Sequence, residues 1–119
     1  MNNAKEILAS ICEAIERKKG EKVSILDVRK VSSFTDFFII CQGGNRRQNQ
    51  AICDEIVEGL KSKEQMSPLH VEGYEHAEWI LLDYVDMIVH VFSEDARQFY
   101  KLEKLWSDGV QVKPRARSA

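Results

Sequence analysis

Apolar side chains recur along the chain with two different spacings, which predict an alternating series of helices and strands. In residues 3–19 and again in residues 46–63, they recur every three or four positions, the spacing of one face of an α-helix. Asn45 precedes the second helix as a predicted N-cap, and Gln48 stands three residues later in the capping-box position. Short segments rich in apolar and β-branched residues predict strands instead. These segments are residues 23–28, 37–41, 69–72, 79–82 and 87–92.

The last two of these strands lead into a third predicted helix. Four residues, Asp-Tyr-Val-Asp at 83–86, separate the strands and predict a tight turn between them. Ser93 then follows as a predicted N-cap, and Glu94 and Asp95 place negative charge in the first helical turn, where the helix dipole favours it. Apolar residues continue at helical spacing and predict one buried stripe. The stripe consists of Ala96, Phe99, Leu102 and Trp106.

The order of these elements predicts the fold class and the domain organisation. Helix, two strands, helix, three strands and helix indicate an α/β (α+β) fold, with a single mixed β-sheet of about five strands flanked by helices. We expect one domain over residues 1–107, because no repeat or linker divides the chain. Residues 108–119 contain Lys113, Arg115 and Arg117 with little to bury, and we expect a mobile C-terminal tail there.

Composition and charge narrow the function classes. With 44% hydrophobic and 30% charged residues, the chain resembles an ordinary soluble domain, and its net charge of −2 gives no broad reason to bind nucleic acid. We find no apolar run of membrane-spanning length and no signal-peptide pattern. Three widely spaced cysteines match neither a disulfide framework nor a paired metal site. These features predict a cytoplasmic protein with buried thiols.

The residues offer little support for catalysis. Gly43-Gly44-Asn45 could present backbone N–H groups to a phosphate at a strand-to-helix junction, as in small nucleotidyltransferases. Such an enzyme also needs closely spaced carboxylates to hold metal, and the chain contains no Asp-x-Asp or Asp-x-Glu pair. No Cys or acidic residue stands at zinc spacing from a histidine. We therefore expect neither an enzyme nor a cofactor.

An aromatic and polar segment favours an interaction surface instead. Trp79 opens its predicted strand, just after Tyr74, His76 and Glu78. Because side chains alternate along a strand, Trp79, Leu81 and Asp83 point to the same side. Aromatic side chains of this kind dominate binding energy when a partner covers them. The bare chemistry therefore predicts a partner-binding patch around Trp79.

Six segments, in order and at close spacing, resemble the Iojap family of ribosomal silencing factors. They are SFTDFFII at 33–40, RQ at 47–48, VEG at 71–73, WILLD at 79–83, HVF at 90–92 and FYKLEKLW at 99–106. The resemblance spans about residues 4–106. It implies a nucleotidyltransferase-like fold without catalytic carboxylates. It also implies a non-enzymatic protein that binds the large ribosomal subunit through that subunit's protein fourteen, sterically blocks joining with the small subunit and represses translation when nutrients are scarce.

The resemblance also implies which residues touch the partner. Carried over by motif, they are Glu78, Trp79, Asp83, Tyr84 and His90, together with Tyr74 and Arg97. An acidic and aromatic patch suits a basic ribosomal protein, because opposite charge steers the encounter. The family usually has glycine where this chain has Val85, so we expect a different turn after Asp83 and an altered placement of Tyr84.

Three other functions and two oligomeric states stay open at this point. Organellar relatives act in large-subunit assembly, so an assembly factor is one alternative. A degenerate nucleotide-binding, nucleotidyltransferase-like protein centred on residues 43–45 is the second, and a nucleic-acid-binding module that uses Lys113, Arg115 and Arg117 is the third. An exposed sheet edge is compatible with a monomer or a homodimer.

Overall fold

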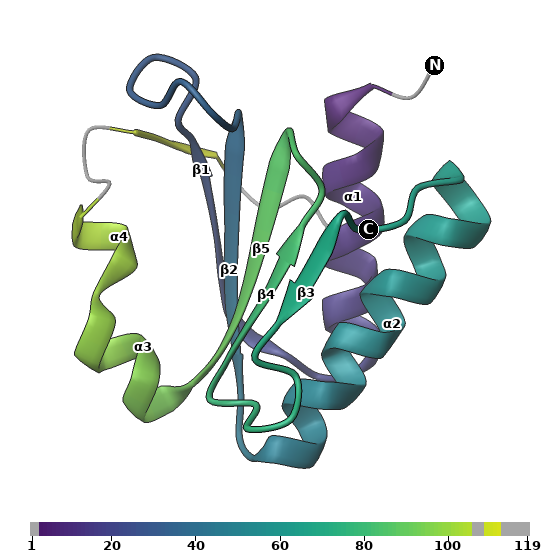
Figure 1. The fold of residues 1–119 in the computed structure, drawn as a ribbon, viewed down its shortest axis with the longest axis vertical. Coiled ribbons are helices and arrows are strands. Elements are labelled where there is room, and N and C mark those ends of the chain that lie inside the picture. The colour runs from purple at the N-terminus through teal and green to yellow at the C-terminus, as the bar shows by residue number, and fades with distance from the viewer. Residues whose placement is uncertain (1–2, 106–108, 113–119) are drawn as a thin grey trace.

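The computed structural model describes residues 3–105 and 109–112 and arranges them around one six-stranded sheet (Figure 1). The strands are β1 (Glu21–Asp27), β2 (Phe37–Gly43), β3 (His70–Glu72), β4 (Trp79–Asp83), β5 (Met87–Ser93) and β6 (Val110–Val112). Their order across the sheet is β3-β4-β5-β2-β1-β6. Only β2 and β5 run parallel; the other neighbours are antiparallel. The predicted mixed sheet is therefore confirmed.

One strand lies where the sequence predicts a tail. β6 pairs with β1, with Val112 opposite Ile25 and Val110 opposite Asp27. The sheet thus has one strand more than expected, and residues 110–112 belong to it. A Val-Gln-Val triplet is too short to predict a strand by itself, because its pairing depends on a partner far away in the sequence. Residues 106–108 and 113–119, including the basic part of the predicted tail, lie outside the described residues.

The two long helices cover one face of the sheet (Figure 1). α1 (Ala4–Arg17) begins after Asn3, whose side chain accepts a hydrogen bond from the Glu6 N–H, and α2 (Arg46–Glu64) begins after Asn45 as predicted. The Gln48 side chain accepts from the Gly44 N–H and so satisfies a backbone donor before the helix. Together with the sheet they enclose the larger core. Its fully buried members include Ile11, Ile15, Ile39, Ile52, Ile56, Ile80, Leu82, Val89 and Val91.

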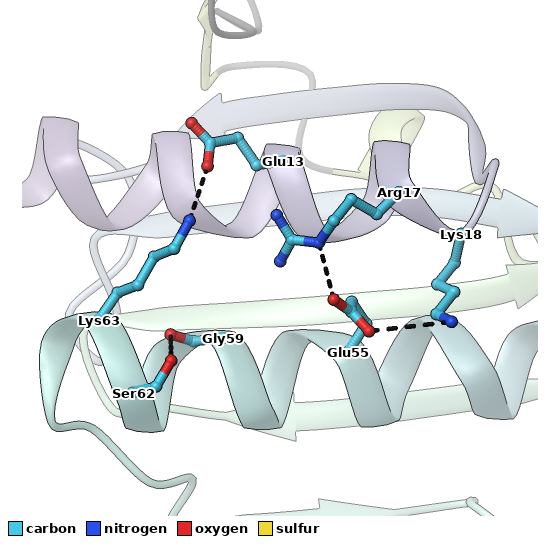
Figure 2. A network of polar contacts seen from close by, with 7 residues as sticks. All are labelled: Glu13, Arg17, Lys18, Glu55, Gly59, Ser62 and Lys63. Carbon is cyan, nitrogen blue, oxygen red and sulfur yellow. Dashed lines mark hydrogen bonds and ion pairs between the residues drawn. The ribbon is translucent and has the colours of Figure 1, made fainter.

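Ion pairs join the exposed sides of α1 and α2. Figure 2 shows Arg17 and Lys18, at the C-terminal end of α1, both directed at Glu55 of α2. The Nε atom of Arg17 lies 2.7 Å from the Glu55 carboxylate. One to two turns away, Lys63 Nζ lies 3.1 Å from Glu13. Each pair is partly exposed and contributes at most about 1 kcal/mol. The buried apolar stripe, rather than these pairs, therefore holds the two helices on the sheet.

The opposite face of the sheet is covered in part only. α3 (Glu94–Tyr100) and α4 (Leu102–Leu105) lie on this side (Figure 1). Ala96 and Leu102 pack there against Leu26, Phe38, Ile40 and Phe92. Leu81 and Asp83 of β4 point to the same face but are only half-buried. Among the described residues, no helix is long and apolar enough to cross a membrane.

The predicted third helix is interrupted. Lys101 has a positive φ of 49°, and its N–H bonds to the carbonyl of Arg97 before α4 starts in a new direction. As a result Ala96 and Leu102 are buried, whereas Phe99 is 78% exposed. The prediction of one uninterrupted stripe through Phe99 is wrong, because the left-handed residue rotates the following turn relative to α3. Trp106, the last member of that stripe, lies outside the described residues.

The turn between β4 and β5 carries backbone strain at Val85. The Asp86 N–H donates to the Tyr84 carbonyl across Val85, whose φ is 73°. This pattern belongs to the strained form of the γ-turn, and positive φ is unfavourable for a β-branched residue. Asp83 stabilises the turn by accepting a hydrogen bond from the Val85 N–H at 2.8 Å. Valine thus adopts a positive φ here despite its branched side chain, contrary to the premise of the expected change; that the turn differs from the one usual in the family stays a prediction.

Val85→Gly should therefore stabilise the protein. Glycine adopts positive φ without a Cβ clash, and Val85 is 53% exposed, so little buried surface is lost. Relief of the backbone strain stabilises the folded state, whereas the greater freedom of glycine stabilises the unfolded chain. We expect a net gain of about 1 kcal/mol in the free energy of unfolding, measured by urea denaturation. Val31→Gly is the matched control: Val31 is also partly exposed but has no positive φ, and its replacement should destabilise. A lower stability of Val85→Gly would contradict the strain argument.

Candidate partner-binding site

The hairpin of β4 and β5 brings the predicted aromatic and polar residues to one face of the sheet. Trp79 stands opposite Phe92, Leu81 opposite His90, and Asp83 opposite Ile88. Directly opposite residues in an antiparallel pair share a face, and side chains alternate along each strand. This is the face on which α3 and α4 lie, away from α1 and α2.

Trp79 is half-buried and is held by its neighbours on several sides. Its ring centroid lies 4.6 Å from that of Tyr100, 5.0 Å from Phe92 and 5.9 Å from His90. Its indole Nε1–H donates a hydrogen bond to Nδ1 of His90 at 2.9 Å. The side chain thus combines an ordered position with a remaining exposed surface, which is the property of a binding anchor.

His90 lies beneath the surface. It is 4% exposed, and this burial lowers its pKa to about 4 from the ordinary 6.5. Because Nδ1 accepts the bond from Trp79, the proton of the neutral ring is on Nε2, which has no hydrogen-bond partner among the described residues. Its ring is steeply inclined to that of Phe38, at 74°, with centroids 5.2 Å apart. His90 therefore supports Trp79 from below and presents almost no surface of its own.

Two aromatic residues that the sequence analysis did not assign to the site extend it. Tyr100 contacts Trp79 and is 50% exposed, and the highly exposed Phe99 meets Tyr100 edge-on at 5.0 Å. We call Trp79, Leu81, Phe99 and Tyr100 the aromatic surface. Helical spacing assigned Phe99 to the packed side, so only the break at Lys101 reveals its exposure.

Carboxylates border the aromatic surface. Glu78 is exposed beside Ser93, whose hydroxyl donates to it at 2.9 Å. Asp83 ends β4 with one oxygen bound by the Val85 N–H. Glu72 of the edge strand β3 stands opposite Leu81 and is exposed. Asp83 lies on the same face as Trp79, as strand alternation predicts, whereas the Glu78 carboxylate bonds Ser93 at the end of the strand. Glu72 adds a third negative charge.

Three of the predicted contact residues lie elsewhere. Tyr84 is 5% exposed within the core under α1 and α2, and Tyr74 packs against that same core while donating its hydroxyl proton to Asp54. Arg97 faces inward from α3, where it binds both carboxylate oxygens of Glu103 and the Lys22 carbonyl. These residues do not form one patch with Trp79, because motif order along the chain does not specify which face a side chain takes.

The glycine turn lines a separate hollow with negative charge. β2 and β5 are parallel neighbours. The helix that follows β2, α2, packs on one face of the sheet, and the helix that follows β5, α3, packs on the other. The carboxyl ends of the two strands therefore form a topological switch point. The hollow of about 290 Å³ includes Gly43, Gly44 and Arg46, but three carboxylates, Glu78, Glu94 and Asp95, also line it and outnumber the one guanidinium. Such charge repels phosphate groups. Among residues 3–105 and 109–112, no three His, Cys, Asp or Glu side chains are placed to hold a metal ion.

Comparison with known proteins identifies relatives over most of the chain. The family model described as "Ribosomal silencing factor during starvation" (RsfS) matches residues 1–119. A protein of Halalkalibacterium halodurans named "Ribosomal silencing factor RsfS" is 40% identical over 107 residues, which cover 90% of this chain and 91% of the relative. A crystal structure of a protein from Chromobacterium violaceum aligns with a TM-score of 0.86 and 30% identity, covering 99% of this chain and 97% of that one.

A more distant relative carries a different name. The mouse protein "Mitochondrial assembly of ribosomal large subunit protein 1" is 26% identical over 106 residues. The match covers 87% of this chain and 46% of the mouse protein.

Proposed function

This chain belongs to the family of ribosomal silencing factors, and from that premise we propose that it binds the large ribosomal subunit through the subunit's protein fourteen. Bound there, it would occupy the face that the small subunit must approach, and it would block the small subunit sterically. Joining, and with it translation, would then fall when nutrients are scarce. Its relatives are named as regulatory factors, and we propose that this chain likewise acts without catalysis or a cofactor, in the cytoplasm, as a monomer or a homodimer.

The observation that supports this proposal most is the aromatic surface with its acidic border. Trp79 is ordered yet partly exposed, and Phe99 and Tyr100 extend its exposed area. Monomeric proteins seldom expose clustered aromatic rings without a use for them in binding. The carboxylates of Glu72, Glu78 and Asp83 complement the positive charge of a ribosomal protein and would speed its encounter.

These contacts revise the proposed set of partner-binding residues. We retain Trp79, Glu78 and Asp83 as direct contacts and add Phe99 and Tyr100. His90 remains in the proposed site, but underneath Trp79. The burial of Tyr84 and the internal contacts of Tyr74 and Arg97 favour structural roles for all three.

Sedimentation of ribosomal subunits tests the proposed function. Purified large and small subunits are mixed at a magnesium concentration that normally permits joining, with and without the protein. We expect the protein to migrate with the large subunit and the fraction of joined ribosomes to fall as protein is added. Failure to migrate with the large subunit would leave family membership intact and remove the proposed function.

Large-subunit assembly is the second candidate, and the name of the mouse relative favours considering it. Migration with the large subunit while joining stays normal would support assembly over silencing. A degenerate nucleotide-binding function is less well supported, because three carboxylates face a single arginine, Arg46, in the hollow at Gly43 and Gly44. A nucleotidyltransferase-like ancestry remains a prediction from the resemblance.

A further inference from the structure

The hydrogen bond between Trp79 and His90 fixes how the aromatic surface is presented. The donor is the indole Nε1–H and the acceptor is Nδ1 of His90, on the neighbouring strand, at 2.9 Å. Trp79 has rotational freedom about two side-chain bonds, and an exposed tryptophan would lose that freedom on binding. Here the bond, together with the Phe92 and Tyr100 rings, already selects one orientation in the free protein.

The bond also solves a problem that arises when a partner covers the indole. A buried N–H without an acceptor is unfavourable, because it has lost its water and gained nothing in exchange. Protein fourteen, or any partner that packs flat on Trp79, would expel the water near Nε1. Since His90 accepts this hydrogen bond from inside the protein, the partner need not supply an acceptor of its own.

His90 is itself fixed and protected. Its ring is nearly parallel to Phe92, at a centroid distance of 6.0 Å, and is inclined at 74° to the ring of Phe38. At 4% exposure it presents almost nothing to a partner, so its effect on binding must pass through Trp79. Its burial also keeps the ring neutral, with Nδ1 free to accept, at physiological pH.

We propose that His90 is a positioning residue that orients Trp79 and satisfies its indole N–H before the partner arrives. The inference rests on the proposed function and deepens it. It replaces the expectation that His90 touches the partner with a role one layer below the contact. The binding surface would accordingly be pre-organised, with the aromatic anchor ordered before the encounter.

Two substitutions of His90 separate this role from simple packing. His90→Asn places an amide oxygen close to the position of Nδ1 and so keeps an acceptor for Trp79. His90→Leu fills much of the same buried space without an acceptor. We expect His90→Leu to bind purified large subunits about tenfold more weakly than the unaltered protein, and His90→Asn to stay within about threefold of it. Trp79→Phe, which keeps a ring and removes the N–H, should lose at least as much as His90→Leu.

The indole proton gives a readout that packing alone does not move. In a ¹H–¹⁵N spectrum of the free protein, the Nε1–H signal of Trp79, identified by its absence in Trp79→Phe, should exchange slowly with solvent and shift downfield. His90→Leu should abolish both properties, and His90→Asn should retain them in part. Combining His90→Leu with Trp79→Phe should weaken binding no further than Trp79→Phe alone, because the acceptor then has no donor.

The possible results distinguish the two levels of the proposal. If the unaltered protein binds and His90→Leu binds equally well, the positioning role is wrong while the proposed function stands. Additive losses in the double variant would likewise overturn the positioning role. If the unaltered protein does not bind large subunits, the proposed function is wrong and this inference falls with it.

Discussion

Trp79→Ala is expected to weaken binding to the large ribosomal subunit by about 2 kcal/mol or more, roughly a thirtyfold loss of affinity. The reason is geometric. Trp79 stands between the exposed Tyr100 and the half-buried Leu81, so its ring is the centre of the aromatic surface. The measurement is co-sedimentation with purified large subunits over a range of protein concentrations. The same variant should lose its effect on subunit joining.

Matched controls separate a loss of contact from a loss of fold. Val71→Ala removes a partly exposed apolar side chain from the other face, where Val71 lines a hollow beside α2, and binding should be unchanged. Trp79 also packs against the smaller core, so circular dichroism and urea denaturation must show that the Ala variant folds. Phe99→Ser avoids this difficulty, because Phe99 is highly exposed, and it should weaken binding by about 1 kcal/mol. Normal binding by both site variants would contradict the proposed surface.

The second large effect is a loss of stability in acid that depends on His90. Above pH 6.5 the imidazole is neutral in both folded and unfolded protein, and it contributes no dependence on pH. Below pH 6.5 the unfolded chain takes up a proton, whereas burial holds the folded-state pKa of His90 at about 4. The unfolded state is therefore favoured progressively as pH falls from 6.5 to 4. The loss should reach about 3 kcal/mol at the lower end of this range.

Urea denaturation at a series of pH values checks this prediction, and His90→Leu supplies the reference. The lowered pKa values of Asp27 and Glu103, each caused first by a hydrogen bond from an arginine side chain, also remove stability in acid. Both carboxyls are present in the variant, so the difference between the two proteins isolates the imidazole. We expect the unaltered protein to lose more stability than His90→Leu as the pH falls from 6.5 to 4, because only the unaltered protein carries the buried imidazole. Parallel curves would show that His90 is protonated as readily in the folded state as in the unfolded state.

Local physics explains what could be predicted from the sequence. The caps at Asn45 and Ser93 were predicted correctly, because a capping side chain binds a backbone N–H only three residues away. Trp79, Leu81 and Asp83 point to the same face of the sheet because side chains alternate between the two faces along a strand. The family resemblance, carried by short motifs in order, was confirmed by the family model and the relatives.

The composition of the candidate site could be predicted only in part. Trp79 and Asp83 share one face of β4, but Tyr100 joins Trp79 from α3, a helix whose direction depends on how it packs over the sheet. Arg97 belongs to the same helix and points the opposite way, toward β1 and β2. A helix presents different residues to different sides, and its rotation about its own axis depends on contacts with residues far away in the sequence.

By itself, the sequence determined the order and type of most elements, the chain's family and the tryptophan at the centre of the candidate surface, because periodicity, capping and motifs act over a few neighbouring residues. Only the tertiary structure decided that Val110–Val112 completes the sheet, that Lys101 turns Phe99 outward and that His90 lies beneath Trp79. Each of these depends on pairing or packing between segments distant in sequence. Such contacts form only when the whole chain is folded, and no local pattern encodes them.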